Sequence, residues 1–100
     1  MITSVDIALD KRGIRIPDPK SGKLSKFIPW GLLNREKILP NVDKITGRNR
    51  DFNFEVFYVR KTIDGNKLEK LYPSQREALK AIDIFLIRSG RDPQHILQKS

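Results

Sequence analysis

The stretch FNFEVFYVRKTIDGNKLEKLY, residues 52–72, carries the strongest fold signal in the chain. Its first part, residues 52–62, is rich in aromatic and β-branched side chains, which favour an extended strand. An Asp-Gly pair at 64–65 supplies the positive φ that a tight reversal needs. Residues 67–72 then form the returning strand of a β-hairpin. With a third strand over residues 41–46, the pattern predicts a three-stranded antiparallel meander.

The segment after the hairpin has the boundary signals of an α-helix. Ser74 and Glu77 have the spacing of a capping box, in which each residue satisfies a free backbone N–H group. Gly90 stands where a helix C-terminus favours a left-handed residue, so the helix is expected to span residues 75–89. Apolar side chains recur on one broad face of this helix: Ala78, Leu79, Ala81, Ile82, Phe85 and Leu86. An Asp-Pro pair after Gly90 predicts a short C-terminal helix within residues 91–100.

The first forty residues are predicted to form a β-rich extension. Residues 2–9 and 13–16 are expected to pair as strands. Segment 17–23, which contains proline and glycine, is a loop by composition. Residues 34–39 are expected to form one or two helical turns.

The predicted fold class is α+β, with all 100 residues in a single domain. Residues 41–90 form the central module, a three-stranded antiparallel sheet packed against one amphipathic helix. The N-terminal extension over residues 1–40 precedes this module, and the short C-terminal helix over residues 91–100 follows it.

Side chains alternate between the two faces of the long predicted strand. One face is expected to pack on the helix through Phe54, Val56 and Tyr58. The outer face then carries Asn53, Glu55, Phe57, Val59 and Lys61. On that outer face, Phe57 and Val59 either contact DNA or pack beneath the N-terminal extension. If the extension covers this face, DNA binding by the sheet is blocked.

The chain is strongly basic, with 20 Lys and Arg residues against 12 Asp and Glu residues, a net charge of +8 and an isoelectric point near 10.1. The excess is concentrated in residues 11–50, where eleven basic residues stand against three acidic ones. Such a charge favours a polyanionic partner, and nucleic acid is the first candidate. The alternative is a soluble basic protein whose lysines are only solvated.

Enzymatic functions have little support in the sequence. A chain of 100 residues has little material for a deep catalytic cleft, and it has no phosphate-binding glycine loop, no paired histidines and no nucleophile elbow. The absence of cysteine excludes disulfides and thiolate chemistry, and the single histidine, His95, is poor support for a metal site. We therefore expect a protein that is not an enzyme and that has no cofactor or metal. No apolar run approaches the ~18 residues of a membrane span, so we expect a cytoplasmic protein without a membrane partner.

Four features along the central module occur together in a known family: a basic polar turn, a strand, an Asp-Gly turn, and an aromatic residue with a capping residue before the helix. They lie at residues 46–50, 54–60, 64–67 and 72–78. On these features, residues 44–90 resemble the ethylene-response-factor-type, integrase-like DNA-binding domain of plant transcription factors, phage integrases and homing endonucleases. The resemblance implies that the sheet face away from the helix lies in the major groove, where alternating side chains meet phosphates and base edges.

Two arginines between the first two predicted strands, Arg48 and Arg50, are placed to contact phosphate or to enter a groove. The other expected nucleic-acid contacts are Arg60, Lys61, Lys67, Lys70, Lys44 and Lys23. Any one of these cations has the alternative of an ordinary solvated surface charge. Trp30 and Phe57 are candidate interface residues, and Trp30 either stacks on a base or belongs to the core.

The first functional hypothesis is a small DNA-binding protein of phage or mobile-element type that holds duplex DNA through Lys and Arg residues of its sheet and loops. The alternative is a protein-protein interaction module, such as a phage-encoded inhibitor of a host nucleic-acid-handling enzyme, acting in the host cell. That alternative needs an apolar patch in the basic face, formed by Trp30, Leu32, Leu33 and Phe57. RNA binding ranks third. The sequence leaves the oligomeric state open.

Overall fold

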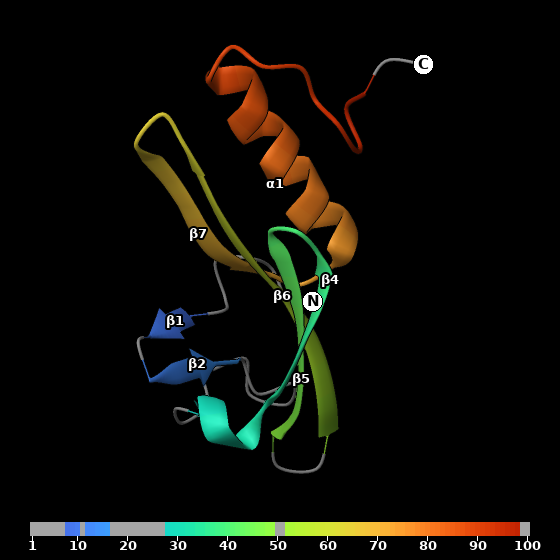
Figure 1. The fold of residues 1–100 in the computed structure, drawn as a ribbon. Coiled ribbons are helices and arrows are strands. Elements are labelled where there is room, and N and C mark those ends of the chain that lie inside the picture. Colours follow the sequence, from blue (N-terminus) through green and yellow to red (C-terminus); the bar gives the residue numbers. More distant parts are fainter. Residues whose placement is uncertain (1–7, 11, 17–27, 50–51, 99–100) are drawn as a thin grey trace.

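The main sheet of the computed structural model has four antiparallel strands in the order β4-β5-β6-β7 (Figure 1). These are β4 (Asn34–Leu39), β5 (Val42–Asn49), β6 (Phe52–Ile63) and β7 (Asn66–Tyr72). The residues that the structure describes are 8–10, 12–16, 28–49 and 52–98. Strands β5, β6 and β7 lie where the sequence indicated strands. The prediction of a three-stranded sheet is nevertheless wrong, because β4 adds a fourth strand.

Strand β4 occupies the segment for which helical turns were expected. It pairs antiparallel with β5, and the register shifts between Lys37 and Leu39. Pairing with the edge of β5 satisfies the backbone hydrogen bonds of the segment, so tertiary context overrides its local helix propensity. The shift brings the side chains of both Ile38 and Leu39 against the core beneath the helix.

A second, smaller sheet has three short antiparallel strands in the order β1-β2-β3. Its elements are β1 (Ala8–Asp10), β2 (Gly13–Arg15) and β3 (Ile28–Pro29), and a short 3-10 helix, η1 (Trp30–Leu32), follows β3. The expected pairing of the first two segments is present, with Leu9 opposite Ile14. The earlier part of the first predicted strand, residues 2–7, and the predicted loop lie outside the described residues.

Helix α1 (Gln75–Arg88) has boundaries close to the predicted ones. The Ser74 Oγ accepts a hydrogen bond from the Glu77 backbone N–H at 3.2 Å, as the capping-box spacing predicts. Gly90 follows the helix with a φ of 79°, a left-handed conformation that glycine adopts at low cost. The helix therefore starts and stops where its local sequence specifies.

The described part of the C-terminal segment, residues 91–98, contains no helix, so the predicted short C-terminal helix is wrong. Asp83 of α1 is fully buried, and its carboxylate accepts hydrogen bonds from the backbone N–H groups of Gln94, His95 and Leu97 at 2.9, 3.1 and 2.8 Å. Because these donors converge on one side chain, the segment wraps around the carboxylate instead of forming a helical turn.

The two faces of β6 pack against layers opposite to those expected. Phe57 and Val59 are buried beneath α1, together with Ala78 and other apolar residues of the helix. Phe54 and Tyr58 lie under the small sheet, in a second core cluster. The predicted assignment of faces is therefore wrong. Alternation specifies which side chains share a face, but both faces of this strand are apolar, so alternation does not specify which layer covers each one.

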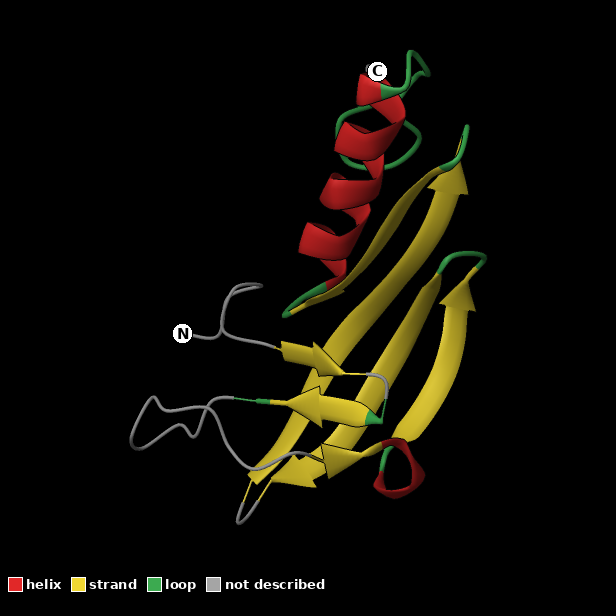
Figure 2. Cartoon of the chain, turned by 90° about the vertical axis from the view of Figure 1, so that its left-hand side faces the viewer, coloured by secondary structure: helices red, strands yellow, loops and turns green. Residues whose placement is uncertain are grey.

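The described residues cover each face of the main sheet over only part of its length (Figures 1 and 2). In Figure 2 the small sheet crosses in front of the lower part of the main sheet, and no described residue crosses in front of the upper part, which contains the β6–β7 hairpin. We call the side that carries the small sheet, which includes Tyr58 and Arg60, the distal face. The side that carries α1, which includes Phe57 and Val59, is the proximal face. Helix α1 packs on the hairpin half of the proximal face, through Val59 and Ile63.

Candidate nucleic-acid interface

The uncovered part of the distal face is rich in charged side chains. Alternation and strand register place on it Arg35 and Lys37 of β4, Asp43 of β5, Arg60 and Thr62 of β6, and Lys67 and Glu69 of β7. Arg15 of β2 points outward on the same side, because its neighbours Ile14 and Ile16 are buried against the main sheet. These residues bring five cations and two carboxylates to one side of the protein.

An aromatic stack joins the small sheet to this face. The rings of Trp30 and Tyr58 are stacked with their centroids 6.1 Å apart and their planes inclined by 20°. The Arg35 guanidinium carbon lies 5.5 Å from the Trp30 ring centroid and 5.0 Å from that of Tyr58, within the range of a cation–π contact. Arg35 Nε also donates to Asp43 Oδ2 at 2.6 Å. Trp30 is therefore half-buried in the core and is not a free platform for a base.

A second cluster on the distal face is centred on Glu69. The Tyr58 hydroxyl donates to Glu69 Oε2 at 2.6 Å. Lys67 Nζ lies 3.4 Å and Arg60 Nε 3.7 Å from the same oxygen atom. One hydroxyl and two cations thus converge on a single carboxylate oxygen. The Glu69 side chain is still 32% exposed, so solvent reaches the cluster.

The ionisation of Tyr58 and Glu69 reflects this contact. Burial, and then the hydrogen bond and the negative charge of Glu69, raise the pKa of Tyr58 to about 12. The hydrogen bond from Tyr58, followed by the charges of Lys67 and Arg60, lowers the pKa of Glu69 even though partial burial opposes the shift. At neutral pH the cluster therefore contains a neutral phenol, an ionised carboxylate and two cations.

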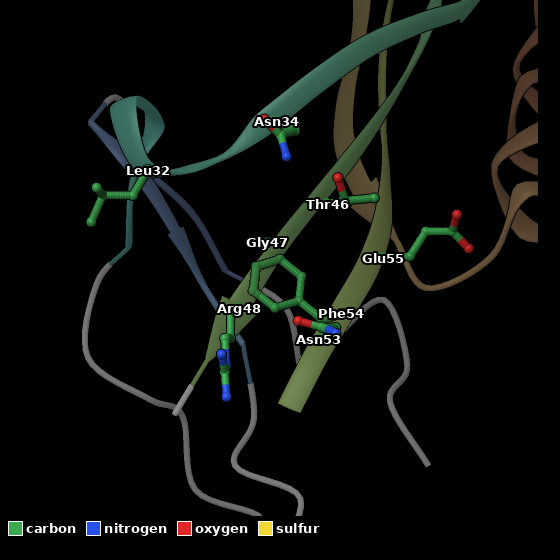
Figure 3. A pocket seen from close by; sticks show the side chains of 8 residues that line it. All are labelled: Leu32, Asn34, Thr46, Gly47, Arg48, Asn53, Phe54 and Glu55. Carbon is green, nitrogen blue, oxygen red and sulfur yellow. The ribbon is translucent and has the colours of Figure 1, made fainter. Parts of the chain in front are cut away.

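The uncovered part of the proximal face contains a shallow hollow of about 660 Å³ (Figure 3). Its lining residues are Leu32, Asn34, Thr46, Gly47, Arg48, Asn53, Phe54 and Glu55. Lys44 Nζ is paired with Glu55 Oε1 at 3.0 Å beside it. On this half-face, the positive charges of Lys44 and Arg48 are balanced by the carboxylates of Glu36 and Glu55. The hollow therefore offers amide and hydroxyl groups without an excess of positive charge.

The cations expected to bind nucleic acid do not form one surface. Arg60 and Lys67 lie on the distal face, whereas four others lie on the proximal face: Lys44, Arg48, Lys61 and Lys70. Arg50 and Lys23 lie outside the described residues. Phe57 is 5% exposed beneath α1 and is unavailable as an interface residue.

Five residues of the distal face were not predicted from the sequence as members of a site: Arg15, Arg35, Lys37, Tyr58 and Glu69. Arg35 and Lys37 share the distal face only because residues 34–39 form a strand, and the helical prediction for that segment hid this relationship. The useful signal was the short two-residue separation between this segment and β5, which is typical of a hairpin.

Comparison with protein-family models finds no match to this chain, and comparisons with curated proteins and with solved structures find none either. Within the described ranges, no group of three or more Asp, Glu and His side chains is placed to hold a metal ion. No helix among those residues is long and apolar enough to cross a membrane.

Proposed function

We propose that this protein binds duplex DNA through the distal face of its main sheet. The observation that carries the proposal is the gathering of Arg15, Arg35, Lys37, Arg60 and Lys67 on one exposed side. Among the side chains that the structure describes, the carboxylates placed between these cations are Asp43 and Glu69. A local excess of cations on the surface of a β-sheet attracts the phosphate backbone and raises the rate of encounter.

The other exposed surfaces support the proposal less well. Among the described side chains, the uncovered part of the proximal face has as many carboxylates as cations, and its Lys44 is already held by Glu55. The apolar patch expected for a protein inhibitor is not formed by the described residues, because Phe57 is buried and both Trp30 and Leu33 pack on the core. Only Leu32 of that group is largely exposed, at 75%.

The proposed mode differs from the one that the family resemblance implied. The small sheet covers the part of the distal face around Phe54 and Tyr58, so the whole sheet does not enter the major groove. The uncovered hairpin half contributes Arg60, Thr62 and Lys67, which project from neighbouring strands. These side chains suit contacts to phosphates, which position a protein on DNA without reading the base sequence.

The test compares two variants with the same change in net charge. The distal variant replaces Lys37, Arg60 and Lys67 by glutamine, and the proximal variant replaces Lys70, Arg76 and Lys80 by glutamine. All six side chains are exposed. Affinity for a random-sequence duplex is measured by fluorescence anisotropy over a series of salt concentrations, with an RNA duplex in parallel.

We expect the distal variant to lose affinity and to show a shallower salt dependence, by about 0.9 in the logarithmic slope for each phosphate contact removed. The proximal variant should keep a slope close to that of the wild type. Equal losses in both variants would show that affinity follows net charge alone. The proposal is also overturned by an absence of binding at low salt, or by tighter binding of the RNA duplex.

A further inference from the structure

The Glu69 carboxylate has the surroundings of a bound phosphate oxygen. Its Oε2 atom receives the Tyr58 hydroxyl at 2.6 Å, and the cationic groups of Lys67 and Arg60 lie 3.4 and 3.7 Å away. Charge-assisted contacts of this kind are the ones by which proteins hold phosphate groups. The donors come from two neighbouring strands, so the backbone of the sheet fixes their spacing.

Three features make Glu69 a replaceable occupant of this position. It lies on β7, which is one of the two edge strands of the main sheet and has a neighbouring strand on one side only within that sheet. Its side chain is 32% exposed, whereas Tyr58 is only 8% exposed and is fixed by the Trp30 stack. Contacts between partly exposed charges contribute little net stability, so the carboxylate can leave at low cost.

We propose that Glu69 occupies an anion position that a DNA phosphodiester takes when the protein binds, and that Glu69 thereby weakens binding. This inference rests on the proposed function, because it concerns the same distal face. In the free protein, the single negative charge of Glu69 offsets one of the two positive charges of Arg60 and Lys67. In the complex, a phosphate oxygen accepts the hydrogen bond from the Tyr58 hydroxyl and contacts the two cationic groups, and the Glu69 side chain turns into solvent.

The experiment uses Glu69→Gln and a matched control, Glu55→Gln. Both substitutions remove one negative charge, and each replaced carboxylate has a lysine partner: Lys67 for Glu69, and Lys44 at 3.0 Å for Glu55. Glu55 lies on the proximal face, outside the proposed contact surface. We expect Glu69→Gln to raise the affinity for duplex DNA by about tenfold relative to Glu55→Gln, the size of one contact to a charged group.

A second measurement detects the anion position without DNA. Inorganic phosphate is titrated into Glu69→Gln and Glu69→Ala at constant ionic strength. The signal is the fluorescence of Trp30, the single tryptophan of the chain, which stacks on Tyr58. Both variants should show a saturable change that is absent in wild type and in Glu55→Gln. Adding Arg60→Gln to either variant should abolish the change.

The outcomes separate this inference from the proposed function. If Glu69→Gln and Glu55→Gln raise DNA affinity equally, the inference is overturned while DNA binding stands. If no variant binds DNA but both Glu69 variants bind phosphate, the proposed function fails and the anion position remains. If neither Glu69 variant responds to phosphate and Glu69→Gln leaves DNA affinity unchanged, the inference fails. Circular dichroism establishes that the variants are folded, and Glu69→Gln alone decides the result if Glu69→Ala is not.

Discussion

The indole ring of Trp30 lies on the phenol ring of Tyr58, with centroids 6.1 Å apart and planes inclined by 20°. Trp30 belongs to η1, which follows the small sheet, and Tyr58 belongs to the long central strand β6 of the main sheet. This pair therefore links the small sheet, which covers part of the distal face, to a strand that carries part of the candidate interface. The core beneath it includes Ile14, Ile16 and Val56.

Replacing Trp30 by alanine should loosen the small sheet from the main sheet. The ring is half-buried, so we expect the free energy of unfolding to fall by about 2–3 kcal/mol, somewhat less than for a fully buried aromatic residue. Leu32→Ala is the control, because this neighbouring side chain is 75% exposed and its loss should change stability by less than about 0.5 kcal/mol. Urea unfolding followed by circular dichroism compares the two. Equal midpoints would show that the stack does not stabilise the fold.

Gly47 is required by close packing rather than by an unusual backbone angle. A Cβ atom at this position would lie 2.6 Å from Leu33 Cδ2 and 2.8 Å from the Cζ atom of the buried Phe54 ring. We expect Gly47→Ala to destabilise the protein by about 1–3 kcal/mol through overpacking. Gly31→Ala is the matched control, since nothing lies within 4 Å of the added Cβ. A thermal unfolding series that ranks the two variants equally would contradict this contact.

The parts of the fold that local sequence specifies were predictable. The Asp-Gly turn at residues 64–65 has positive φ at both positions, and the Ser74 cap starts α1 where the capping-box spacing indicates. Both features depend on a few neighbouring residues, so their physical cause is visible in the sequence.

The parts that depend on contacts distant in sequence were not predictable in the same way. Residues 34–39 have a local preference for helix, which their pairing with β5 overrides. Strand β6 has two apolar faces, and either one could pack against α1 while the other packs against the small sheet. The sequence pattern around Phe57 and Tyr58 is compatible with both arrangements. These two errors in the predicted fold also prevented prediction of the candidate site. Its charged side chains converge only when β4 is a strand and the small sheet packs on the distal face.

The stability that the hydrogen bonds between the Asp83 carboxylate and the C-terminal segment provide should depend on pH. Burial on its own would raise the pKa of Asp83, but the backbone N–H groups of Leu97, Gln94, Ile96 and His95 outweigh burial and lower the pKa below its ordinary value of 3.8. Because the pKa is lower in the folded state, this carboxylate contributes stability above pH 3.8, and the contribution is lost as the pH falls through the folded pKa.

The substitution Asp83→Asn tests the contribution of these hydrogen bonds to stability. The amide cannot accept as many hydrogen bonds as the carboxylate, so we expect a loss of about 1–3 kcal/mol at neutral pH. The difference in stability between variant and wild type should shrink as the pH falls below 3.8. Hydrogen exchange of the backbone N–H groups of Gln94 and Leu97 should also become faster in the variant. A stability difference that stays constant down to acid pH would contradict a role for the charged form.

The Tyr58 hydroxyl provides a direct measure of its contact with Glu69. Burial is the larger cause of its raised pKa and the Glu69 carboxylate is the next, so Glu69→Gln should move the pKa from about 12 toward 10.0 without reaching it. Ultraviolet titration in a Tyr72→Phe background isolates this group, because the chain has two tyrosines. The direction of this pKa shift also predicts how the stability of the protein changes at alkaline pH. A phenol whose pKa is raised on folding stabilises the protein below pH 10.0, and that contribution is lost as the pH rises through about 12. Glu69→Gln, with a smaller rise in pKa, should therefore lose less stability over that interval than wild type. An unchanged Tyr58 titration in the variant would mean that the hydroxyl does not donate to Glu69 in solution.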